Sequence, residues 1–218
     1  MRLFLLIICI SFLELTQLFG QNFSPFQAGI TLGMNVSQVD GDEYSGYRKI
    51  GLQAGIQGIA NISDNLFIST EFLFSQRGAS PSNKEKLESF ENFIDIRLNY
   101  IEVPFLINVR VGKKRDDFRT LRIFGGVSIG RLIGSNIDQT GESLTFYPFL
   151  NMEEIVEDFE SFDFSLVLGF QRNFSKNLGL FFKHTLTLND LYVPVGEQNP
   201  YNNLEPFHFT LGASYLIY

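Results

Sequence analysis

The chain has no tryptophan, two histidines and a single cysteine among its 218 residues. That cysteine, Cys9, lies near the amino terminus, so the rest of the chain has neither a disulfide nor a thiol nucleophile. No internal stretch reaches the roughly 18 consecutive apolar residues of a membrane-spanning helix, although 44% of the residues are hydrophobic. A net charge of −7 disfavours nucleic acid as a partner. Metal-ligand spacings, phosphate loops and nucleophile elbows are missing, so the sequence predicts neither a cofactor nor an enzyme.

The amino terminus has the pattern of a secretory signal peptide. Arg2 precedes an apolar segment, residues 3–13, whose length suits the hydrophobic region of such a leader. Glu14 interrupts the pattern, and an uncleaved anchor is the alternative. We expect residues 1–20 to be the signal peptide and residues 21–218 to be one domain. The leader carries one basic and one acidic residue, so its removal leaves the net charge at −7.

Apolar and polar residues alternate along about eight segments of the remaining chain. In the first segment Phe26, Ala28 and Ile30 are apolar, whereas Gln27, Gly29 and Thr31 are polar or glycine. Such alternation places one face of a strand in an apolar medium and the other in a small, polar one. Each segment is about long enough to cross a bilayer as a tilted strand. The expected strands are residues 26–37, 49–60, 66–77, 99–111, 120–133, 162–173, 178–189 and 207–218.

The connections between these segments alternate in length, with residues 61–65, 112–119 and 174–177 as short ones. Short periplasmic turns and long external loops are usual in outer-membrane barrels. The sequence therefore predicts an all-β, eight-stranded antiparallel up-and-down transmembrane β-barrel with both ends in the periplasm. Pro206 falls outside the expected strands, whereas Pro104 falls inside one and predicts a bulge or a strand end there.

The alternative is a soluble periplasmic barrel that binds an apolar ligand and turns its apolar face inward. The polar faces favour the membrane barrel because they are rich in glycine and carry few charges, as a narrow lumen requires. Unpaired buried charges are costly, so we expect a plugged lumen with a ladder of salt bridges. A gated ion path is the less favoured interpretation of the same residues. The ladder consists of Glu71, Glu102, Arg110, Arg122, Asp163 and Lys183.

Two histidines and two loop segments are the remaining candidates for chemistry. A lipid-modifying enzyme could use His184, on the apolar face, or His208, on the polar face, but no serine pattern marks a nucleophile. Ser82 to Glu85 resemble a capping box and predict a short helix that extends to Ile94. Residues 153–160 place acidic side chains on one face of a second expected helix. We expect a solvated face there, with binding of a cation or a basic partner left open.

The segment LNYIEVPFL, residues 98–106, resembles the Y-x-E-x-P strand of the PorT-like outer-membrane barrel proteins of Bacteroidetes. Tyr100, Glu102 and Pro104 carry the resemblance, and residues 29–35 and 124–130 look like two further strands of that family. The resemblance implies an eight-stranded barrel in the outer membrane of a Gram-negative, Bacteroidetes-like cell, in contact with membrane lipid. It implies no single activity, although the founding member is tied to protein secretion.

These observations together predict a non-enzymatic outer-membrane protein without a cofactor or a metal. We expect its external loops, residues 134–161 above all, to contact envelope or secretion proteins. The sequence leaves open which partner or solute it meets, its oligomeric state and whether it works within a secretion system.

Overall fold

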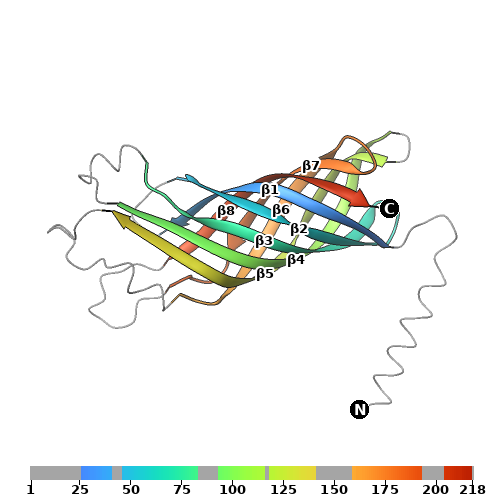
Figure 1. The fold of residues 1–218 in the computed structure, drawn as a ribbon. Coiled ribbons are helices and arrows are strands. Elements are labelled where there is room, and N and C mark those ends of the chain that lie inside the picture. Colours follow the sequence, from blue (N-terminus) through green and yellow to red (C-terminus); the bar gives the residue numbers. More distant parts are fainter. Residues whose placement is uncertain are drawn as a thin grey trace, which may run out of the picture.

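The computed structural model describes residues 26–40, 46–82, 93–115, 118–140, 159–192 and 204–217. Eight antiparallel strands follow one another in chain order and close into a barrel, with β1 beside β8 (Figure 1). The predicted fold is therefore confirmed. The start of β1 and the end of β8 lie at the same end of the barrel, as an even strand number requires. The strands are β1 Phe26–Asp40, β2 Lys49–Asn61, β3 Leu66–Ala79, β4 Phe93–Arg115, β5 Phe118–Thr140, β6 Phe162–Asn173, β7 Leu178–Thr187 and β8 Glu205–Ile217.

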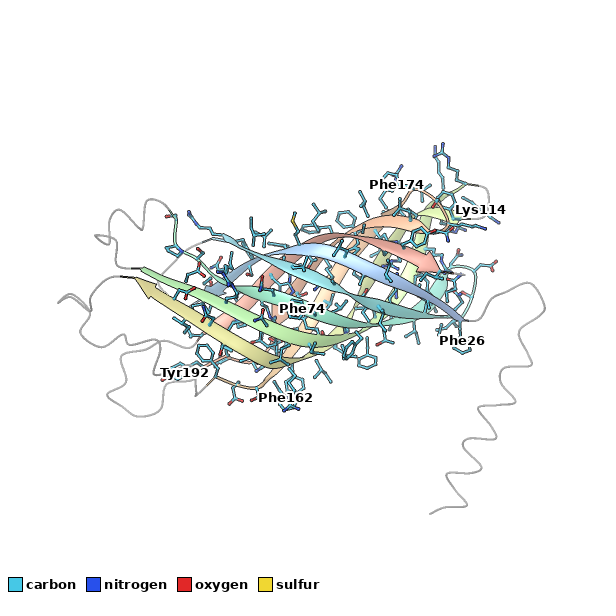
Figure 2. The ribbon with its side chains drawn as sticks, in the orientation of Figure 1. Phe26, Phe74, Lys114, Phe162, Phe174 and Tyr192 are labelled. Atoms are coloured by element: carbon cyan, nitrogen blue, oxygen red, sulfur yellow. The ribbon has the colours of Figure 1, made fainter. Side chains whose placement is uncertain are left out.

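The two faces of the strands have opposite chemistry. Large apolar side chains cover the outside, and Leu168 and Leu211 are 60% and 59% exposed there. Phe26 and Phe162 project from the outer surface as well (Figure 2). The lumen face carries buried polar side chains such as Asn35. The phenylalanine-rich faces thus point outward, whereas a soluble barrel with an apolar ligand would turn them inward.

The strands β4 and β5 are much longer than the sequence predicts, at 23 residues each. A β-bulge explains why periodicity missed part of this extension. Asn99 pairs with Gly134 and Tyr100 with Leu132, so β5 has one extra residue, Ile133. An extra residue reverses the faces of every position that follows it. Ile137 is consequently buried, whereas apolar residues at odd positions earlier in β5 face outward.

Both proline expectations are wrong. Pro104 is buried inside β4, pairs with Ser128 of β5, and the register continues unbroken on both sides of it. The β3–β4 register is the same before and after the proline, so the missing N–H is tolerated without a bulge. Pro206 lies in β8 as its second residue, opposite Val39. A strand tolerates proline best near its first residue, because few ladder hydrogen bonds are lost there.

The loop and leader predictions lie mostly outside the described residues. These include the leader, the first expected helix between residues 83 and 92, and residues 151–158 of the second. Ile94, expected to end the first helix, belongs to β4 instead.

Gly126 marks a point where β4 and β5 approach closely. A Cβ atom there would lie 2.0 Å from the carbonyl oxygen of Phe105 and 3.0 Å from the Cα of Leu106. Both are backbone atoms, so we expect Gly126→Ala to lower the free energy of unfolding by about 1–3 kcal/mol. Urea unfolding of the protein in lipid vesicles measures this. Gly58→Ala is the matched control, since its Cβ meets only Thr70 Cγ2 at 3.9 Å. Equal losses in both variants would contradict the explanation.

Candidate functional site

The loop-end part of the lumen is organised around Arg77 of β3, which is 0% exposed. Its Nη2 lies 3.3 Å from Glu102 Oε1 of β4 and 3.3 Å from Asp163 Oδ2 of β6. The guanidinium carbon lies 3.8 Å from the centre of the Tyr100 ring, and Nη1 lies 3.5 Å from His208 Nδ1. One cation thus compensates two carboxylates contributed by different strands.

Two residues of the Y-x-E-x-P segment, Tyr100 and Glu102, contact Arg77 in this region. Tyr100, Glu102 and Pro104 are two positions apart, so strand alternation turns all three toward the lumen. Each of them is buried. Tyr100 packs under the Arg77 guanidinium and Glu102 forms an ion pair with it. The motif therefore supplies the β4 side of the buried cluster.

Further along the lumen, Lys183 Nζ of β7 lies 3.2 Å from Glu71 Oε2 of β3. Uncharged polar side chains also link strands, among them β1 and β3, which are not neighbours in the sheet. Asn35 Nδ2 of β1 donates to Ser75 Oγ of β3 at 2.9 Å, and Thr210 Oγ1 of β8 donates to Asn35 Oδ1 at 2.8 Å. An apolar cluster fills another layer, formed by Leu106, Phe124, Val167 and Phe181. The interior is a packed core and contains apolar layers that the sequence did not predict.

At the end of the barrel with the short turns, the lumen widens into a cavity of about 460 Å³. The β4–β5 hairpin forms part of the cavity wall and contains two cross-strand pairs of like-charged residues. Arg110 lies opposite Arg122, and Lys114 lies opposite Arg119. Arg110 donates from Nη2 to Asn61 Oδ1 at 2.6 Å and from Nη1 to the Asp64 carbonyl oxygen at 3.3 Å.

The six residues grouped in one ladder by sequence thus lie in three places. Lys183 and Glu71 form one pair. Glu102 and Asp163 share Arg77, a residue that the sequence analysis missed. Arg77 is six positions after Glu71 in the same strand, so the two side chains lie on the same face. This spacing could have identified Arg77 as a lumen residue. Arg110 and Arg122 lie opposite each other at the turn end, where the sequence analysis expected carboxylate partners. Charge count alone could not reveal this, because pairing depends on register.

The loop end is covered by an apolar cluster that joins strand ends to loop segments. Phe159, Leu191 and Leu204 lie between strands and are at most 7% exposed. A single antiparallel bridge between Tyr192 and Leu204 holds two of these segments together. Lys49 and Asp95 form an ion pair at the same end. Among the described residues, its buried members are Val39, Ala79, Ile96, Leu98, Tyr100, Ile137, Phe159, Leu191, Tyr192 and Leu204.

The two histidines lie on opposite faces of the barrel wall. His184 is on the outside, where its ring stacks on Phe209 with centroids 4.0 Å apart. Tyr47 Oη lies 3.4 Å from His184 Nε2. Burial, and secondly the charge of Asp40, raise the pKa of Tyr47 above its ordinary value. His208 is inside and fully buried.

Neither histidine forms a hydrogen bond with a serine in the part of the chain that the structure describes. Ser37 is the cross-strand partner of His208, but its hydroxyl bonds to the backbone of Gly78, so no activated nucleophile is assembled among these residues. The described ranges also contain no group of three or more His, Cys, Asp or Glu side chains placed to hold a metal ion. No helix among these residues is long and apolar enough to cross a membrane.

One family model matches most of the chain. The family model described as outer membrane protein beta-barrel domain matches residues 17–193. Ail, the attachment invasion locus protein of Yersinia pestis, is 14% identical with a TM-score of 0.48, covering 88% of this chain and 98% of Ail. Neisserial surface protein A is 12% identical with a TM-score of 0.42, covering 88% and 97%. CarO of Acinetobacter baumannii is 12% identical with a TM-score of 0.43, covering 87% and 97%. No curated protein matches the sequence.

Proposed function

This chain belongs to the outer membrane protein beta-barrel domain family, and we propose that it is a non-enzymatic, non-conducting barrel that binds envelope proteins through its loop end. A barrel of this family contacts membrane lipid through its outer face. The extension of β4 and β5 at the loop end carries the proposal. Arg131 is the last β5 residue paired with β6, yet β5 continues to Thr140 in register with β4 (Figure 1).

This two-stranded extension provides a rigid surface beyond the part of the barrel that contacts lipid. On its inner side, Ile96, Leu98 and Ile137 pack into the apolar cluster of the loop end. On its outer side, Ile133 is 54% exposed, and Asn136 and Asp138 are exposed too. Loops held by a rigid scaffold are the usual carriers of binding function. The arrangement suits protein contact better than solute passage, because buried side chains fill the lumen beneath it.

The PorT-like resemblance supports a partner in protein secretion or envelope assembly. The residues that carry it, Tyr100, Glu102 and Pro104, stabilise the lumen below the extension. We propose that the resemblance extends to a Bacteroidetes-like envelope and to an accessory role there. The positions of His184 and His208 on opposite faces favour a non-enzymatic protein over the lipid-modifying alternative.

Site-specific photo-crosslinking in intact cells tests the proposal. A photoreactive amino acid replaces Asn136 on the extension, and a matched variant carries it at Ile62, an exposed residue in the turn between β2 and β3. We expect the Asn136 variant to yield a discrete adduct with one envelope protein and the Ile62 variant to lack that adduct. The same adduct from both positions, or none from Asn136 and its neighbour Ser135, would refute loop-end binding.

A further inference from the structure

The turn end of the lumen has a concentration of positive charge that the barrel fold does not require. Among the residues that the structure describes, five cationic side chains and one carboxylate, Asp64, line the cavity. The cations are Arg110, Lys114, Arg119, Arg122 and Lys176. The chain as a whole is acidic, with a net charge of −7, whereas the charged side chains that line this cavity are mostly cationic. The hairpin tip, Asp116 and Asp117, lies outside the described residues.

Register brings four of these cations into direct opposition. Arg110 is the cross-strand partner of Arg122, and Lys114 is the partner of Arg119. Like charges directly opposite each other destabilise a strand pair. Arg110 and Arg122 also share one aromatic neighbour, because their guanidinium carbons lie 4.2 and 5.6 Å from the centre of the Phe67 ring. Two pairs of this kind on one hairpin concentrate positive potential along one wall of the cavity.

Arg122 is buried without a direct ion pair to any carboxylate in the described ranges, and it is only 5% exposed. Its Nε has no hydrogen-bond partner among those residues, and the Phe67 and Phe124 rings lie beside it. The charge of Glu71 also acts on Arg122, but that carboxylate is paired with Lys183. A buried cation without a carboxylate of its own is costly, and an anion at this position would offset that cost.

The remaining wall is suited to a small oxyanion. Arg119 is held by neutral acceptors: Nε donates to Asn65 Oδ1 at 2.7 Å, and Nη1 donates to the Gly112 carbonyl oxygen at 3.0 Å. These contacts orient the guanidinium without cancelling its charge. Guanidinium groups bind phosphate and carboxylate oxygens in a bidentate manner. Inward-facing residues such as Phe67 and Gln171 line the cavity, so it opens into the lumen mouth and away from the lipid-facing wall.

We propose that this cavity binds a small, soluble oxyanion with at least two negative charges, such as a phosphate monoester or pyrophosphate. Arg110 and Arg122 form the inner part of the site, and Lys114, Arg119 and Lys176 form its rim. With the short turns in the periplasm, the ligand is a periplasmic solute or the phosphorylated group of one. The site is independent of the contacts proposed for the loop end.

Isothermal titration of the full-length barrel in phosphatidylcholine vesicles, with inorganic pyrophosphate as the probe, tests the proposal. We expect saturable binding with one ligand per barrel. Arg122→Gln should weaken the affinity at least tenfold, since one charge-assisted contact is lost. Because Arg122 is buried, Arg119→Gln on the rim serves as a second variant, with a weakening of several-fold. Heat-modifiable gel mobility verifies that each variant is folded.

Lys113→Gln is the matched control, because Lys113 is an exposed cation beside Lys114 that does not line the cavity. The affinity of the Lys113→Gln variant for pyrophosphate should stay within about twofold of the wild type if binding depends on direct contact with the ligand and not on net charge. Equal weakening by Lys113→Gln and Arg119→Gln would overturn the site, as would the lack of saturable binding. Vesicles that contain phosphatidylglycerol should leave pyrophosphate binding unchanged. Competition by this lipid would overturn the assignment to a soluble ligand.

Discussion

Replacing Arg77 with methionine is expected to lower the free energy of unfolding by about 3–5 kcal/mol, because two buried carboxylates lose their cation. Glu102 and Asp163 are 3% and 4% exposed, and each lies 3.3 Å from the Arg77 guanidinium. Urea unfolding in lipid vesicles, followed by gel mobility of unboiled samples, measures the loss. The affected charges come from β3, β4 and β6, so we expect the whole barrel to open at a lower urea concentration.

Neutralising the carboxylates together with the arginine should restore much of this stability. In the triple variant Arg77→Met, Glu102→Gln, Asp163→Asn, none of these three positions carries an unpaired charge, and replacing a buried ion cluster by neutral groups is often tolerated. A single variant as stable as the wild type would show that the carboxylates have another partner. A triple variant as unstable as the single one would show that Arg77 acts through packing on Tyr100.

Leu211→Arg is expected to lower the free energy of unfolding in vesicles by about 2–4 kcal/mol, because it places a charge on the lipid-facing side. Leu211 is the central residue of β8 and 59% exposed, and it pairs with the outward-facing Met34 of β1 and Phe182 of β7. The same unfolding assay measures the loss.

Ile62→Arg provides the comparison for this substitution. Ile62 is 42% exposed but lies in a turn outside the strands, where a charged side chain reaches water. We expect a change of about 0–1 kcal/mol there, as near the membrane interface. If Leu211→Arg were as mild as Ile62→Arg, the outer face would be in water. The soluble barrel considered from the sequence would then describe the molecule better.

The residue pattern predicted the strands in the middle of the barrel more completely than their extensions at the loop end. Alternation in residues 26–37 matches the two faces of β1, since a strand in a closed sheet has one side in lipid and one in the lumen. The same logic missed residues 93–98, where Ile96 and Leu98 face inward. At the loop end the inside of the barrel becomes an apolar core, so the apolar residues change faces and the expected alternation disappears.

Sequence by itself determined the number of strands, their order and their outward faces, because period-two alternation and short turns act within one strand or between neighbours. Tertiary structure decided which charges meet. Arg77 reaches Asp163 across the lumen from β3 to β6, and Arg110 comes to lie opposite Arg122 through the β4–β5 register. Both outcomes depend on how far each strand is staggered when the sheet closes. Stagger is a property of all eight pairings together and is not carried by the residues of any one strand.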